Sequence, residues 1–162
     1  MANELKKEVT ITRILDVPRA TVWRAWTDPK IVPKWWGPRG VTIPECEIEP
    51  RKGGKIHIVM LAGKELGPAE GTRWPMTGTF EEVTPQSRLV FAANAEDGNS
   101  QTILETRTTV TFDEIQGKTK VTVHTLLTKS TDTPQAKFAV QGMEMGWNQQ
   151  MDKLGEHFKM NK

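Results

Sequence analysis

Three histidines and one cysteine are the residues best suited to hold a metal ion. His57 and His124 fall on predicted strands and His157 on a predicted helix, with no other histidine or cysteine at ligand spacing. A metal site needs several donors that converge on one point. We therefore expect no metal site, and we expect His57 and His124 to point away from the apolar faces of their strands.

Nucleophilic and acid–base chemistry has as little support. Cys46 lies between Glu45 and Glu47, whose charges would raise the pKa of the thiol if they lie close to it. The serines fall in predicted turns, without a Gly-x-Ser-x-Gly elbow, and residues 51–55 form a basic turn rather than a phosphate-binding loop. No two carboxylates are paired in a cleft by any sequence pattern. We identify no catalytic residue, and no metal, nucleotide or covalent cofactor is implied.

Composition favours a single globular domain spanning residues 1–162, with 36% apolar and 26% charged residues. The net charge of +2 is small and dispersed, which argues against a nucleic-acid partner. Residues 1–7 lack the apolar run of a signal peptide, and no stretch is apolar enough for membrane insertion. The single cysteine excludes an intramolecular disulfide, so we expect a cytoplasmic protein.

Periodicity predicts one strand, two short helices and then about six strands. Residues 8–17 alternate like a strand, residues 18–27 form an amphipathic helix, and Asp28-Pro29 opens a second short helix toward Trp35-Trp36. A long loop covers 62–73, residues 96–99 form a turn, and Gln116-Gly117 joins the last two strands as a hairpin. The later strands are predicted at 41–49, 55–61, 74–83, 88–93, 102–113 and 118–129.

The period then changes to that of a long C-terminal helix, predicted over residues 134–160. Hairpin-length connections favour an antiparallel sheet, and this helix is the element available to cover its apolar face. The fold class is therefore α+β, with a curved sheet gripping one helix and a cavity expected between them. The helical stripe consists of Val140, Met143, Trp147, Met151, Leu154 and Phe158.

Several motifs resemble those of one superfamily. They are VPRA with VWRAWTDP (17–29), WWGPRG (35–40), CEIEP with GG (46–54), PMTG (75–78), and GW followed by MDKL (146–154). Together they resemble the START-like (SRPBCC) superfamily, which includes polyketide cyclases, and within it the family named after the activator of the heat-shock-protein-90 ATPase. The resemblance implies a helix-grip fold with an apolar cavity. Its members include lipid and sterol carriers, cyclases and chaperone activators, although the eukaryotic activators carry a second domain for which 162 residues leave no room.

The predicted cavity wall combines the helical stripe with the inward strand positions. Adjacent helical residues point about 100° apart, so one of Trp35 and Trp36 can anchor the helix while the other faces the cavity mouth; both could also lie in the core. Arg39 could meet an acidic ligand group or form a surface ion pair. The residues predicted to contact a ligand are Trp36, Ile58, Met60, Met76, Phe80, Thr108, Val123, Thr125, Met143, Trp147 and Met151.

These observations favour a cytoplasmic binding protein for a hydrophobic or aromatic small molecule. One alternative is an enzyme of the cyclase or dehydratase type, which needs an ionisable group inside the cavity. The other is an interaction module with a chaperone or stress-response partner, in which the cavity would be filled. Phe138 and Met145 fall on the helix face opposite the main stripe, which suggests a weak homodimer or a lid contact.

Overall fold

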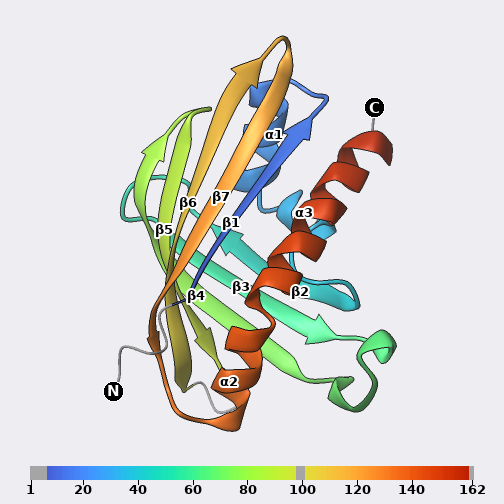
Figure 1. Ribbon diagram of the computed structural model, residues 1–162, viewed down its shortest axis with the longest axis vertical. Coiled ribbons are helices and arrows are strands. Elements are labelled where there is room, and N and C mark those ends of the chain that lie inside the picture. Colours follow the sequence, from blue (N-terminus) through green and yellow to red (C-terminus); the bar gives the residue numbers. More distant parts are fainter. Residues whose placement is uncertain (1–6, 98–100, 161–162) are drawn as a thin grey trace.

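The computed structural model describes residues 7–97 and 101–160, in which seven antiparallel strands form one curved sheet (Figure 1). The strand order is β1-β7-β6-β5-β4-β3-β2, so the first two strands of the chain form the two edges. The strands are β1 (Glu8–Leu15), β2 (Val41–Ile48), β3 (Lys55–Ala62), β4 (Arg73–Thr84), β5 (Arg88–Glu96), β6 (Thr102–Ile115) and β7 (Lys118–Ser130).

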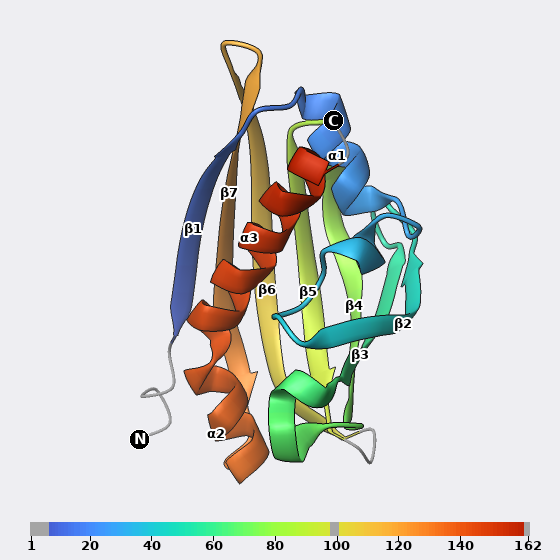
Figure 2. The ribbon, with the colours of Figure 1, turned by 90° about the vertical axis from the view of Figure 1, so that its right-hand side faces the viewer.

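Helices lie at one end of the sheet and across its concave face. Helix α1 (Arg19–Thr27) and the short 3₁₀ helix η2 (Val32–Lys34) connect the two edge strands, while η3 (Lys64–Ala69) lies in the predicted long loop. Helices α2 (Pro134–Gln141) and α3 (Met143–Met160) run over the concave face (Figure 2). The predicted helix-grip fold of the α+β class is confirmed. None of the helices described has the length and apolar character needed to cross a membrane.

Two helix predictions were wrong in extent. The single helix predicted over 134–160 is divided at Gly142, which caps α2 with φ −89° and ψ −1°. Glycine is a poor helix former, so the chain bends there at little cost. The second short helix predicted from Asp28-Pro29 is only the single turn η2, which ends before Trp35.

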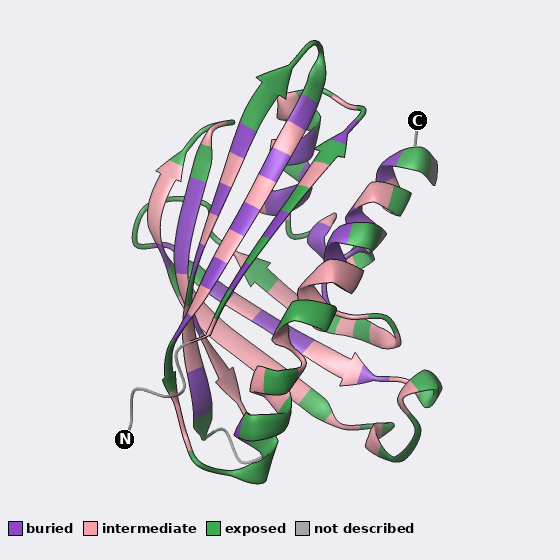
Figure 3. Ribbon diagram, viewed as in Figure 1, coloured by how far each residue is buried: buried purple, intermediate pink, exposed green. Residues whose placement is uncertain are grey.

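Strand register follows the predicted alternation. Gln116 and Gly117 both have positive φ, 51° and 83°, which matches the twist of a tight hairpin turn between β6 and β7. Buried and less buried residues alternate along β7 in Figure 3. Val121 and Val123 point inward and are fully buried, with Val110 beside Val123 on β6. The core therefore lies between the sheet and the helices.

An aromatic cluster fills the core near α1. Trp35 is fully buried and its Nε1 donates to the carbonyl oxygen of Ala25 at 3.0 Å. The Trp26 ring lies 4.7 Å from that of Trp35 and 6.4 Å from that of Trp147. Packed aromatic rings bury large apolar areas. This cluster fixes the segment between η2 and β2 against α3, and so holds Trp36 over the sheet.

Candidate binding cavity

A cavity of about 360 Å³ lies between the sheet and the junction of α2 with α3. Its volume falls within the range of small-molecule sites. Strands β3 to β6 supply its floor, the two helices its roof, and the segment after η2 one wall. Most of its surface is apolar or aromatic. The lining residues are Trp36, Pro38, Met60, Trp74, Met76, Phe91, Ala93, Ala95, Glu96, Asp97, Ile103, Leu104, Thr106, Thr108, Gln135, Phe138, Ala139, Gly142, Met143, Gly146, Trp147 and Gln150.

The cavity exists where small residues of the helices face small residues of the sheet. Ala139, Gly142 and Gly146 succeed one another at spacings of three and four, and so share one helical face. Ala93 and Ala95 lie in the same phase on β5, on the floor beneath. Side chains this short do not fill the space between a sheet and a helix. Toward α1, by contrast, the tryptophan cluster fills that space.

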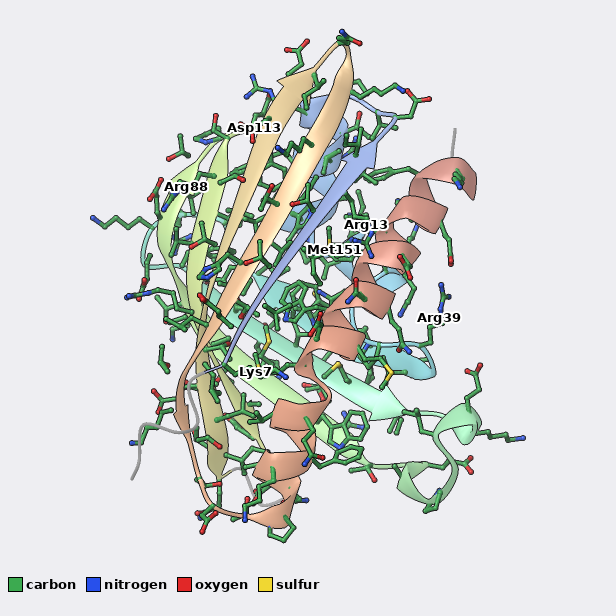
Figure 4. The ribbon with its side chains drawn as sticks, in the orientation of Figure 1. Lys7, Arg13, Arg39, Arg88, Asp113 and Met151 are labelled. Carbon is green, nitrogen blue, oxygen red and sulfur yellow. The ribbon has the colours of Figure 1, made fainter. Side chains whose placement is uncertain are left out.

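The structure brings six of the eleven predicted ligand contacts to the cavity. Of the other five, Met151 and Val123 are fully buried, and Figure 4 shows Met151 between α3 and the sheet. Ile58 and Phe80 are also core residues, and Thr125 is buried on β7 beside Thr108. The six that line the cavity are Trp36, Met60, Met76, Thr108, Met143 and Trp147.

Sequence reasoning missed several lining residues. Trp74 pairs with Met60 across β3 and β4, and Phe91 pairs with Thr108 across β5 and β6, so strand phase alone could have found them. Phe138 was predicted on the helix face opposite the main stripe. It lines the cavity although 75% of it is exposed, so it belongs to the mouth.

Polar groups at the cavity are few. Thr108 and Thr125 share a hydrogen bond of 2.8 Å between their hydroxyl oxygens. Gln150, only 5% exposed, accepts a 2.7 Å hydrogen bond from the backbone N–H of Gly37 through its Oε1. Gly37 has φ +84°, and a methyl group there would come within 2.7 Å of Val41. Glycine is therefore required at this turn.

The turn after η2 is tied to α3 by two cations. Lys153 Nζ donates to the carbonyl oxygens of Trp36 at 3.1 Å and Gly37 at 3.2 Å. Burial, with a smaller contribution from the charge of Arg39, lowers the pKa of Lys153. Arg39 forms a two-pronged ion pair with Glu156 on the outer side of α3 (Figure 4). Arg39 therefore forms the surface ion pair, the second of its two predicted roles.

The three histidines and the cysteine do not line the cavity. His57 is hydrogen-bonded to Glu45 at 3.1 Å, and His124 is hydrogen-bonded to Glu8 at 2.7 Å. Neither histidine lines the cavity. Burial, followed by the charge of Glu47, raises the pKa of Cys46 to about 11. Within residues 7–97 and 101–160, no group of three or more His, Cys, Asp or Glu side chains could hold a metal ion.

Comparison with known proteins places this architecture in a family. Residues 16–159 match the family described as Activator of Hsp90 ATPase homolog 1-like protein. The chain belongs to this family. This membership confirms the resemblance drawn from its motifs. A search of curated proteins found no match.

Solved structures of three bacterial proteins share the fold over nearly the whole chain. A protein of Nitrosomonas europaea is 26% identical with a TM-score of 0.72, covering 95% of both chains. A protein of Rhodobacter sphaeroides is 24% identical with a TM-score of 0.73, covering 96% of this chain and 94% of the other. The AHSA1 protein of Silicibacter pomeroyi is 18% identical with a TM-score of 0.77, covering 96% of this chain and all of the other. At these identities the likeness concerns the fold.

Proposed function

We propose that the protein is a cytoplasmic binding protein that takes up a hydrophobic or aromatic small molecule in the cavity beneath α2 and α3. The observation that carries this proposal is the apolar, aromatic-lined cavity of about 360 Å³. Burial of apolar ligand surface there would supply the binding free energy, at about 25 cal/mol per Å² removed from water. Membership of the Hsp90-activator family supports the fold but names no ligand.

The positions of the candidate side chains bear on the two alternatives. His57 and His124 belong to hydrogen-bonded pairs with glutamates outside the cavity lining, so neither supplies the internal acid or base that a cyclase-like enzyme would need. An interaction module was expected to have a filled interior, and the cavity does not favour it. The binding protein is therefore the function that the geometry supports best.

The test is a titration with the neutral fluorescent probe N-phenyl-1-naphthylamine, together with native mass spectrometry of freshly purified protein. Met143 lines the cavity, whereas Met145, on the same helix, is 63% exposed and lies outside the lining. We expect saturable binding that Met143→Ala weakens at least about threefold, since a buried methylene contributes about 0.8 kcal/mol. Met145→Ala should bind like the natural protein.

A failure would be equally clear. If the probe does not saturate and no small molecule co-purifies, the cavity is not a binding site and the proposal is rejected. Equal weakening by Met143→Ala and Met145→Ala would place probe binding on the helix surface instead.

A further inference from the structure

Charge around the cavity has one sign only. Among the described residues that line it, Glu96 and Asp97 are the only ones with ionisable side chains, and they lie where β5 ends. Two cations at the adjoining turn are engaged elsewhere: Lys153 of α3 donates to backbone carbonyls, and Arg39 of the turn pairs with Glu156. An anion transferred into this space would lose its hydration without gaining a cationic partner. The lining therefore disfavours a carboxylate or phosphate ligand.

The second observation is a buried hydrogen-bond donor without a partner. Gln150 lines the cavity, and its Oε1 is committed to the N–H of Gly37. This bond fixes the orientation of the amide, because the flipped orientation would set two donors against each other. Nε2 is buried and, among the described residues, has no acceptor. A buried donor without a partner is costly, so an acceptor brought by a ligand would relieve a penalty already present in the protein.

We propose that the ligand is an apolar molecule with an oxygen acceptor that carries no negative charge, such as a ketone, ester or amide carbonyl, and that Gln150 Nε2 donates to this oxygen. This inference rests on the proposed function, because it requires the cavity to be the binding site. The apolar floor selects for the body of the ligand. Gln150 selects for its carbonyl, and Glu96 and Asp97 reject its acidic analogues.

Three probes with one naphthalene body test the inference. Methyl 2-naphthyl ketone carries the acceptor, 2-isopropenylnaphthalene replaces that C=O with C=CH₂ at almost the same shape, and 2-naphthoate carries a negative charge. We expect the ketone to shift the side-chain NH₂ resonance of Gln150 in nitrogen–proton correlation spectra, and the hydrocarbon to leave it close to its position in free protein. This measurement needs only the natural protein; Gln150→Met serves to assign the resonance.

Calorimetry with variants supplies the second readout. The affinity ratio of ketone to hydrocarbon should fall at least about fivefold in Gln150→Met, in line with the net value of one hydrogen bond. Naphthoate should bind most weakly, and the double variant Glu96→Gln/Asp97→Asn should improve it. Both amides retain the acceptor oxygens now used by Thr77 and by the N–H of Gln101.

A matched control removes two charges at the other end of the molecule. Asp113 and Glu114 are exposed near the β6–β7 hairpin, and Figure 4 shows Asp113 at the end opposite α2. Asp113→Asn/Glu114→Gln should leave naphthoate binding unchanged. The inference would be overturned if naphthoate bound as tightly as the ketone, or if the Gln150 NH₂ resonance did not shift when the ketone binds. The cavity would still be a binding site in either case. If none of the probes binds, the proposed function itself fails.

Discussion

Filling the cavity from its roof should raise stability and weaken ligand binding at the same time. Gly146 lies inside α3 and lines the cavity, and a methyl group placed there would meet no atom within 4 Å. Replacing a glycine in a helix by alanine gains about 0.5–1 kcal/mol, because the unfolded chain loses conformational freedom. For a domain of this size, that gain corresponds to a rise in Tm of roughly 1–4 °C.

Gly146→Leu extends the same change into the cavity. A leucine keeps the helix propensity of alanine and buries its side chain against the apolar walls, which contributes up to about 1.5–3 kcal/mol on complete burial. The variant should therefore unfold at a higher temperature than the natural protein. It should also bind N-phenyl-1-naphthylamine at least about tenfold more weakly, because the leucine occupies the ligand's space.

Thermal unfolding followed by circular dichroism, combined with probe titration, measures both effects. Gly155→Ala is the matched control: it lies on the same helix, outside the lining, and its new methyl group would make an ordinary 3.8 Å contact with Leu15. It should gain similar stability and keep full binding. A well-packed interior would instead make Gly146→Leu destabilising, by about 1–3 kcal/mol. A lower Tm for Gly146→Leu, or unchanged binding, would refute the cavity as described.

Three further predictions concern titration and association. Burial first, and the charge of Arg39 second, lower the pKa of Lys153 in the folded protein below its ordinary value of 10.5. At a pH between the folded-state pKa and 10.5, the unfolded chain therefore binds more protons than the folded one. The stability of the natural protein relative to Lys153→Met should therefore rise with pH as 10.5 is approached in urea titrations; a fall would contradict the burial of this ammonium. With a pKa of about 11, only roughly one Cys46 thiol in a thousand is ionised at pH 8, so Ellman's reagent should label folded protein much more slowly than unfolded protein; equal rates would argue against it. Phe138 and Met145 are exposed by 75% and 63%, and the weak homodimer predicted through them should appear in sedimentation at high concentration and vanish in Phe138→Ser/Met145→Ser. Monomer alone at every concentration would leave Phe138 with only its place at the cavity mouth.

The sequence predicted the fold closely because its signals were local and repeated. Strand alternation, the turn at Gln116-Gly117 and the helical stripe from Met143 to Phe158 each report on neighbouring residues. The break at Gly142 was missed because an isolated glycine is compatible with a helix, and only packing decides whether the chain bends there.

The cavity was predicted only in part. Strand phase tells which face of the sheet a residue occupies, but not whether the helix opposite it leaves open space or fills it. Met76 and Ile58 are cross-strand partners, yet only Met76 lines the cavity. The boundary between filled and open space depends on what the helices place opposite each row of the sheet. Trp35 fills one end of it, and Gly146 leaves the other end open.

The placement of β1 at one edge of the sheet has a consequence for how the chain is made. Its residues pair with β7 in a register from Glu8↔Leu126 to Leu15↔Thr119, partners that lie 104 to 118 positions apart. At roughly 5–20 residues per second, a ribosome delivers β7 about 5–25 seconds after β1. During that interval β1 lacks the strand with which it pairs. Strands β3 to β7, by contrast, each lie beside the strand that precedes them in the chain, so β2 to β7 can pair one after another as they emerge. β1 is therefore synthesised well before β7 but can dock on the sheet only after β7 has emerged.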